Sequence, residues 1–187
     1  VSPSNYLSDA IASKLKDNVK IHRTTFEKLK IEKSYDLILF SESFQYVNIK
    51  KSLTKIPSLL NKNGSLLICD FFRQPGTGTK PLGGGHDWNV FQEHLKNHFF
   101  NNLIDIDITK ETARTYDLIN KLIEDVAVPV RELSSNYLSS QYPKGMKFLK
   151  WYFDKKISRM NRIYFSGNMT GEMFNKLKTY RILLYKV

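Results

Sequence analysis

The stretch YDLILFSESFQY, residues 35–46, decides the fold of this chain. Its first six residues form a short apolar run, which is typical of a strand buried on both faces of a parallel sheet. Residues 41–46 then place hydroxyl, carboxylate and phenol groups directly after that strand. Because ligands of open parallel sheets bind outside the carboxyl ends of the strands, this polar elbow is where chemistry is expected.

The residues after the elbow predict a helix and a second strand. Four apolar residues at helical spacing give residues 49–60 one buried face: Ile49, Leu53, Ile56 and Leu60. Asn63-Gly64 predicts the end of this helix, since glycine tolerates the left-handed conformation that a helix stop needs. Residues 65–69 (SLLIC) predict the next buried strand, with Asp70 leaving its end. Two parallel strands joined by one helix form a right-handed crossover unit.

Composition bounds the class of protein. The 187 residues suit one domain with an insertion. The one cysteine, Cys69, cannot form a disulfide within the chain, which favours a reducing, cytoplasmic compartment. No apolar run approaches the roughly 20 residues that span a bilayer. The net charge of +11 invites a nucleic-acid partner, but the lysines are scattered along the chain, which argues against one.

The N-terminal third predicts further elements. Val1 is expected to end a strand, and Ser4 to cap a helix. Five residues give that helix an apolar face: Tyr6, Leu7, Ala10, Ile11 and Leu15. Residues 19–24 alternate like a half-buried edge strand. Residues 73–85 form a loop rich in glycine, proline and threonine, whose GTGTK segment (76–80) fits neither phosphate-binding pattern and predicts a mobile loop.

The C-terminal half predicts two strands separated by a helical block. Asp87 should cap a helix that runs to about residue 98, with a buried side made of Val90, Phe91, Leu95 and Phe99. Residues 103–108 alternate strictly, so they predict a strand with one solvated face. Helical patterns fill residues 112–177, with breaks expected at Pro129, Pro143 and Gly167. Residues 179–187 predict the last strand, so the helical block should lie over one end or face of the sheet as a cap.

This order of elements resembles the class I S-adenosylmethionine-dependent methyltransferases. Residues 35–43 (YDLILFSES) are similar to the family's fourth-strand motif, and residues 59–68 (LLNKNGSLLI) to its turn into the fifth strand. Residues 1–4 (VSPS) look like its second-strand ending. The resemblance implies an α/β, Rossmann-like sheet, mostly parallel with an antiparallel last strand and a helical insertion before that strand. Residues 1–109 and 179–187 would form the core and residues 110–178 the cap.

The resemblance also implies a cofactor and its binding residues. The family's first strand and glycine-rich loop have no counterpart here, so we expect roughly 30 or more residues upstream of Val1, the length of a strand-helix-strand unit. The implied cofactor is S-adenosylmethionine, bordered by Ser2, Thr25, Phe26 and Ser41. Ser2 stands where the family has an acidic residue that binds the ribose, and Thr25 stands beside the adenine. Phe26 would be a stacking wall.

Three residues are candidates for contact with the methyl acceptor. Glu42 follows the fourth strand and would bind or deprotonate the acceptor, or else cap the next helix. Tyr46 lies one helical turn further on and would face the same cleft or only pack. His86 follows three glycines, and an imidazole that titrates near pH ~6.5 suits a general base, although it could instead cap the helix at Asp87. The segments GGH (84–86) and DIT (107–109) look most like enzymes acting on small molecules or lipids, so we expect a small or lipid-like acceptor methylated at oxygen or nitrogen.

The remaining signals bear on metals and partners. The histidines have no metal-ligand spacing with carboxylates or Cys69, so no metal is expected. Residues 146–165 place lysines and arginines around Trp151, Tyr152 and Phe153. An apolar stripe at helical spacing accompanies them: Met146, Leu149, Phe153, Ile157, Met160 and Tyr164. This pattern predicts a packed helix with a solvated basic face, or else contact with an anionic lipid surface or an acidic substrate. The rival functions are a non-catalytic partner-binding module and an RNA or DNA methyltransferase that uses the basic face.

Overall fold

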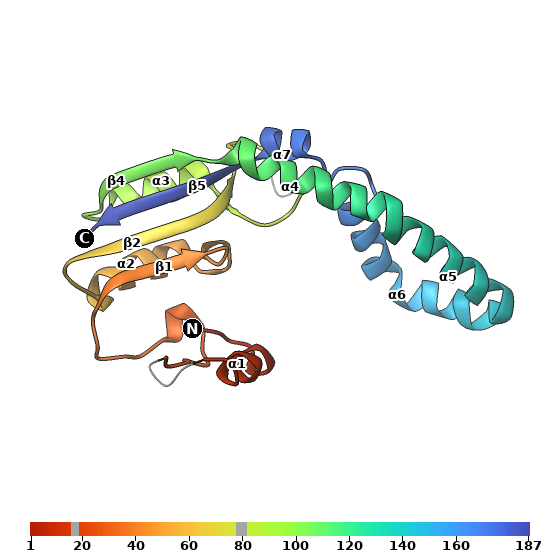
Figure 1. The fold of residues 1–187 in the computed structure, drawn as a ribbon, viewed down its shortest axis with the longest axis horizontal. Coiled ribbons are helices and arrows are strands. Elements are labelled where there is room, and N and C mark those ends of the chain that lie inside the picture. Colours follow the sequence, from red (N-terminus) through yellow and green to blue (C-terminus); the bar gives the residue numbers. More distant parts are fainter. Residues whose placement is uncertain (16–18, 78–81) are drawn as a thin grey trace. The chain divides into compact units, whose positions relative to one another are not determined.

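The computed structural model describes residues 1–15, 19–77 and 82–187. These residues form a five-stranded sheet in the order β1-β2-β5-β4, with β3 beside β2. The strands are β1 (Tyr35–Ser41), β2 (Leu60–Arg73), β3 (His86–Asp87), β4 (Asn101–Asp107) and β5 (Lys178–Lys186). β1 and β2 are parallel, whereas the arrows of β4 and β5 point in opposite directions (Figure 1). The last strand therefore inserts between β2 and β4, which confirms the predicted fold class.

The helices divide between two compact units. The first unit consists of Val1–Asp70, His86–Ile106 and Arg181–Val187, and the second of Phe71–Gly85 and Asp107–Tyr180. The first contains α1 (Asn5–Ala12), α2 (Ile49–Leu59) and α3 (Trp88–Lys96). The second contains α4 (Thr109–Leu122), α5 (Val128–Gln141), α6 (Pro143–Tyr164) and α7 (Gly171–Leu177). The predicted cap, residues 110–178, lies within the second unit, and its role over a site stays a prediction.

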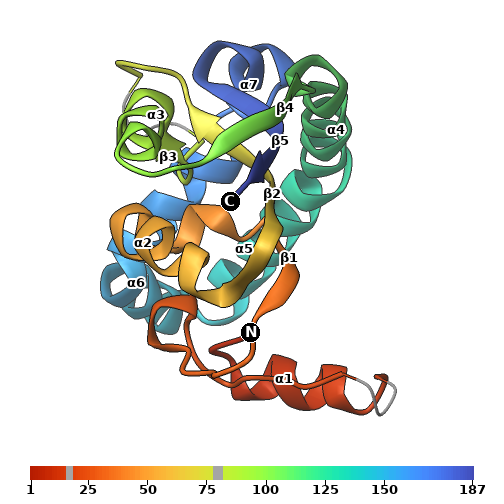
Figure 2. The ribbon, with the colours of Figure 1, turned by 90° about the vertical axis from the view of Figure 1, so that its left-hand side faces the viewer.

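One face of the strands in the first unit carries the core. α2 and α3 lie on the same side of these strands (Figure 2). The predicted face of α2 is buried as expected at Ile49, Leu53 and Ile56, and Leu60 is buried at the start of β2. Along β2 the side chains that point to this side are buried, at Leu66, Ile68, Asp70 and Phe72, while those between them are partly exposed.

The expectation that residues 35–40 are buried on both faces was wrong. Leu37 is 49% exposed and Leu39 is 55% exposed. Among the residues that the structure describes, β1 is the end of the sheet and pairs with β2 alone. An apolar run alone cannot distinguish such an edge strand from a central one, because the difference lies in the neighbours.

The turn into β2 also differs from the prediction. α2 ends at Leu59, before the Asn63-Gly64 pair, and Asn63 is the residue with a left-handed φ of 64°. The pairing moves from Tyr35↔Leu60 to Leu37↔Ser65, so residues 61–64 bulge out of the ladder. A Cβ at Gly64 would lie 2.9 Å from the carbonyl oxygen of Asn61, which explains the glycine. β2 then continues to Arg73, so Asp70 lies inside this strand and not at its end.

The N-terminal strands that the sequence predicted are absent from the described residues. Neither Val1 nor residues 19–24 are in a strand, and one backbone hydrogen bond, from Ser2 N to His22 O at 2.9 Å, joins these segments. A strand needs pairing along its length, and these segments have none. The cap of α1 is confirmed, since Ser4 Oγ accepts a hydrogen bond from Leu7 N. Its predicted apolar face, however, is largely exposed.

The segment around α3 and β4 agrees with the sequence in part. Asp87 caps α3 by accepting hydrogen bonds from the backbone N–H groups of Asn89 and Val90 at 3.0 and 3.3 Å. Phe91 and Leu95 are buried as predicted, but Val90 is exposed, and so is Phe99, which lies beyond the end of α3 at Lys96. All seven residues of β4 are exposed, not those of one face alone, and this strand is the other end of the sheet.

The helices of the second unit are more continuous than predicted. Pro129 does not break the run, because a π-helical turn (Ile123–Ala127) precedes it and widens the backbone where the proline ring would meet a carbonyl. The breaks at Pro143 and Gly167 are confirmed: Tyr142 leaves the helical region, and Gly167 has a φ of 71°. The loop predicted at 73–85 is described except for residues 78–81, so most of its GTGTK segment lies outside the described residues.

Candidate active site

The elbow after β1 is a sharp turn. Ser41 is the last residue of the strand, and Glu42 adopts a left-handed φ of 52°, which is uncommon for a residue with a side chain. The backbone N–H of Glu42 donates to the carbonyl of Cys69 at 2.9 Å, which extends the pairing of β1 and β2 by one residue. Ser43 then starts the short 3₁₀ helix η2 (Phe44–Tyr46). This turn exposes the side chains of Ser41 and Glu42.

A buried carboxylate from β2 holds the elbow, and the sequence did not predict this role. Asp70 is 1% exposed. Its Oδ2 accepts a hydrogen bond from the backbone N of Gln45 at 3.0 Å, and its Oδ1 one from Gln45 Nε2 at 3.4 Å. A buried carboxylate needs such donors to offset the cost of leaving water. The sequence feature that could have indicated this role is an acidic residue inside an otherwise apolar strand.

His86 contacts the elbow from the other side. Its Nε2 lies 2.9 Å from the carbonyl oxygen of Phe44. Since a carbonyl can only accept, Nε2 must carry the proton in this contact, and a general-base role would fall to Nδ1. The imidazole also meets the Phe44 ring edge-on, with centroids 5.6 Å apart. His86 therefore positions the backbone of η2.

Phe44 is the centre of the packing under the elbow. Its side chain is completely buried. Its ring meets Phe40 of β1 and Phe91 of α3 edge-on, with centroids 5.3 and 5.4 Å apart. Such aromatic pairs contribute about 0.5–1.5 kcal/mol each beyond the area they bury. Asp70, His86 and Phe44 together fix the position from which Glu42 and Tyr46 project.

A hollow of about 1710 Å³ lies in the first unit beside β1. Its lining comes from the N-terminal residues, the segment 20–33, β1, η2 and α2. Of the predicted site residues, Thr25, Phe26 and Tyr46 line it. The other four, Ser2, Ser41, Glu42 and His86, are not part of its lining. The structure therefore brings three of the seven predicted residues to one hollow.

The wall of this hollow at residues 25–29 is fastened to α2. Lys55 Nζ donates to the carbonyls of Phe26 and Glu27 at 2.9 and 3.0 Å, and also to that of Leu29. The carboxylate of Glu27 accepts from Asn48 N at 2.7 Å, and this hydrogen bond holds the pKa of Glu27 below its ordinary value.

Phe26 presents part of its ring to the hollow. Its ring packs edge-on against Phe40, with centroids 4.9 Å apart, and Lys55 Nζ lies 5.7 Å from its centroid. Phe26 therefore belongs to a fixed wall, which suits a surface against which a planar group binds.

The two motifs singled out in the second unit form anchors. Thr109 Oγ1 donates to Asp107 and accepts from the backbone N of Tyr180 at 2.9 Å, which joins the start of α4 to β5. Lys178 Nζ donates to the carbonyls of Gly83 and Gly84, the latter at 2.7 Å. Burial, with a smaller effect from the nearby Arg73, lowers the pKa of Lys178 to about 8.

Two further properties concern metals and membranes. Within residues 1–15, 19–77 and 82–187, no three His, Cys, Asp or Glu side chains come together as a metal site. In the same part of the chain, no helix combines the length and the apolar character needed to cross a bilayer.

Comparison with known proteins identifies the fold. No protein-family model matches the chain, and no curated protein matches its sequence. Solved structures do match, over nearly its whole length, and they are S-adenosylmethionine-dependent methyltransferases in several cases. The chain has the class I methyltransferase fold.

Three solved structures illustrate the likeness. The O-methyltransferase of a trans-AT PKS multienzyme of Brevibacillus brevis, in complex with S-adenosyl-L-homocysteine, is 19% identical with a TM-score of 0.57, and the match covers 98% of this chain and 56% of that one. Coclaurine N-methyltransferase, bound to N-methylheliamine and SAH, is 14% identical with a TM-score of 0.61, and the match covers 99% of this chain and 59% of that one. Geranyl diphosphate methyltransferase in complex with SAM is 12% identical with a TM-score of 0.63, and the match covers 99% of this chain and 66% of that one. This chain thus spans less than two thirds of each of them, and at these identities the likeness concerns the fold.

Proposed function

We propose that this protein is an S-adenosylmethionine-dependent methyltransferase that acts on a small or lipid-like molecule at oxygen or nitrogen. One observation carries the proposal: a fixed polar elbow at the carboxyl end of β1 adjoins a large hollow, in a fold shared with methyltransferases. Ligands of such sheets bind at that end of the strands.

The lining of the hollow fits the nucleoside part of the cofactor. Binding cavities for small molecules measure about 300–1,000 Å³, so the hollow of about 1710 Å³ has room for a cofactor and an acceptor. Phe26 offers a fixed aromatic surface to an adenine, and Thr25 a hydroxyl beside it. These two residues would hold the adenosine end, as the sequence predicted.

The remaining residues would act on the acceptor. When bound, the cofactor supplies a sulfonium methyl group that an acceptor atom attacks in line. The protein must align that acceptor and remove its proton where it has one. Tyr46, which lines the hollow, would orient the acceptor, whereas removal of its proton by Glu42 stays a prediction from the sequence, because Glu42 is not part of that lining. His86 would position the elbow through the carbonyl of Phe44.

Calorimetric titration of the complete protein with S-adenosylmethionine tests the proposal. We expect saturable binding that Phe26→Leu weakens roughly 5- to 160-fold, because aromatic stacking on a base is worth about 1–3 kcal/mol. Phe148→Leu, an exposed position on α6, is the matched control and should bind like the parent. Absence of binding at millimolar cofactor would end the proposal.

Binding and activity measurements on the same protein distinguish two rival functions from this proposal. A non-catalytic partner-binding module is favoured by the finding that Ser2, Ser41 and Glu42 do not line the hollow. Saturable cofactor binding together with methyl transfer to any member of a panel of phenols, amines and acyl compounds would exclude it. A nucleic-acid methyltransferase would bind RNA or DNA with an affinity that falls steeply with salt.

A further inference from the structure

The outer side of α6 carries aromatic and basic side chains in one stripe. Seven residues recur at spacings of three and four along the helix and so share one face: Lys144, Phe148, Trp151, Tyr152, Lys155, Arg159 and Arg162. We call this face the aromatic–basic stripe. The apolar stripe from Met146 to Tyr164 follows a different face, on which Met146 and Ile157 are partly buried and the other four residues are exposed. The predicted packing of α6 is therefore slight, since none of its residues is buried.

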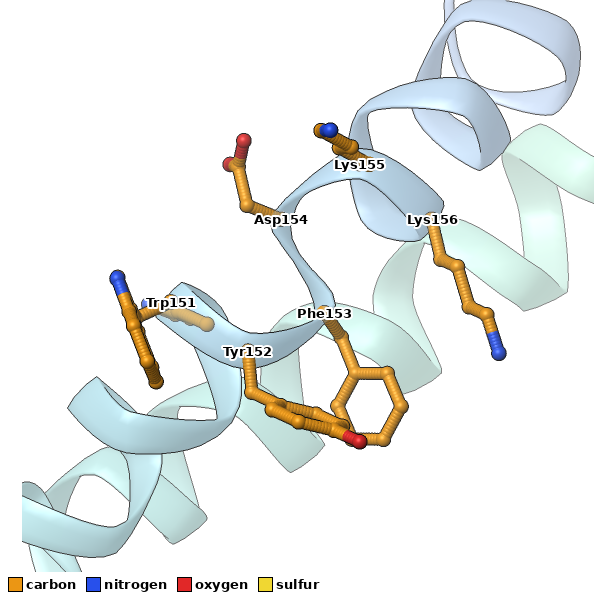
Figure 3. Close-up of a pocket in the computed structure, with 7 residues that line it drawn as sticks. Trp151, Tyr152, Phe153, Asp154, Lys155 and Lys156 are labelled. Carbon is orange, nitrogen blue, oxygen red and sulfur yellow. The ribbon is translucent and has the colours of Figure 1, made fainter.

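The aromatic rings of the stripe are exposed. Phe148, Trp151 and Tyr152 are 58%, 73% and 65% exposed. Trp151, Tyr152 and Lys155 stand out from the ribbon of α6 (Figure 3). The surface hollow of about 930 Å³ at this place is lined by seven consecutive residues of one helix, so it is an open surface and not an enclosed pocket. Exposed apolar groups gathered in this way mark an interaction surface.

The charge on α6 indicates what covers that surface. The helix contains seven basic residues and one acidic residue, Asp154, which falls outside the aromatic–basic stripe. Lysines and arginines attract an anionic surface, and tryptophan and tyrosine favour the headgroup level of a bilayer. The stripe from Lys144 to Arg162 is about 27 Å long at 1.5 Å per residue, so it can contact several headgroups at once.

The arrangement of the rings favours a lipid surface over a nucleic acid. Phe148 stacks on Tyr152, with an interplanar angle of 19°, and is tilted against Trp151, with centroids 5.8 Å apart. Base stacking needs ring faces that are open to successive bases. Phe148 and Tyr152 turn one face to each other, which is thereby less open to a base, and the contacting rings instead suit insertion as a unit among lipid headgroups.

We propose that the aromatic–basic stripe of α6 docks the protein on the surface of an anionic phospholipid bilayer, with α6 lying in the plane of the interface. The rings enter the headgroup layer and the four basic side chains of the stripe contact lipid phosphates. This proposal is independent of the methyltransferase activity.

The two tryptophans of the chain provide a direct test. Trp88 packs against Phe91 and lies beneath the guanidinium of Arg181, 4.9 Å from its ring centroid, whereas Trp151 is on the stripe. In Trp88→Phe, vesicles of phosphatidylcholine with phosphatidylserine should shift the emission of Trp151 to shorter wavelength. In Trp151→Phe the same vesicles should leave the emission of Trp88 unchanged. Vesicles of phosphatidylcholine alone should cause no shift in either variant.

Neutralising basic residues of the stripe measures the electrostatic contribution to vesicle binding. Each basic residue near an anionic surface is worth about 1 kcal/mol, or roughly 5-fold in affinity. Lys155→Gln with Arg159→Gln should therefore weaken co-sedimentation with anionic vesicles roughly 30-fold. Lys110→Gln with Lys150→Gln removes the same charge away from the stripe and should change it little.

Four results would overturn the proposal. They are no binding to anionic vesicles, equal binding to neutral vesicles, equal loss in the stripe and control variants, and tighter binding to single-stranded RNA or DNA than to the vesicles. Circular dichroism of each variant confirms that α6 is folded.

Discussion

The carboxylate of Asp70 offers the sharpest test of how the elbow is held. In Asp70→Ala the backbone N–H of Gln45 loses an acceptor 3.0 Å away, and Gln45 Nε2 loses one 3.4 Å away. A hydrogen bond to a charged group contributes about 1.5–3 kcal/mol, and the longer contact contributes less. The methyl of alanine also leaves a small void beside η2. We therefore expect the free energy of unfolding to fall by about 2–4 kcal/mol.

The assay is urea unfolding followed by circular dichroism, with two comparison variants. Gln45→Ala removes the longer contact and keeps the backbone N–H, so it should cost about 1 kcal/mol or less. Asp70→Asn retains one oxygen that can accept from the backbone N of Gln45, so its loss should lie between the other two. If Asp70→Ala costs no more than Gln45→Ala, or if Asp70→Asn costs as much as Asp70→Ala, this reasoning is refuted.

Three other predictions follow from contacts in the two units. His86→Ala should lower the free energy of unfolding, measured in urea, by about 1–3 kcal/mol. His86→Gln can still donate to the Phe44 carbonyl, so it should lose less. Equal losses in the two variants would contradict the positioning role. Burial lowers the pKa of Lys178 from 10.5 to about 8, so the unfolded chain binds that proton more tightly than the folded one. The free energy of unfolding of the parent should therefore rise by up to about 3 kcal/mol relative to that of Lys178→Met as the pH increases from 8 to 10.5. The same comparison with Lys176→Met, an exposed control, should show no such rise. Gly171→Ala should lower the thermal midpoint and cost about 1–3 kcal/mol, since its Cβ would lie 2.7 Å from a backbone carbonyl of α4; a midpoint equal to the parent's would show that α4 and α7 can separate at no cost.

Local rules predicted much of the fold. Ser4 and Asp87 were identified as caps because a cap depends on residues two or three positions away. Roles that depend on distant partners were missed. Asp70 meets a residue 25 positions away and His86 one 42 positions away, so no spacing pattern could show these bonds. Leu37 was predicted as buried because its exposure depends on which strand lies beside β1.

Within the candidate site, position in the sequence indicated some of the lining residues but not the direction of every side chain. Thr25 and Phe26 were chosen from the family resemblance and Tyr46 from its place after the predicted strand, and all three line one hollow. Glu42 was chosen in the same way, but its left-handed backbone turns it out of that lining. The direction of a side chain at a sharp turn depends on the backbone conformation, which the sequence pattern did not reveal.

Within residues 1–15, 19–77 and 82–187, β1 pairs with a strand on one side alone, and this has a consequence for handling the protein. A strand edge with open N–H and C=O groups and with exposed leucines is a template for a strand of another molecule. Residues 37–40 contain neither a charged residue nor a proline, the residue types that discourage the pairing of a strand from another molecule. Concentrated solutions of this chain should therefore form β-rich aggregates that start at this edge, and a lysine at position 39 should delay them.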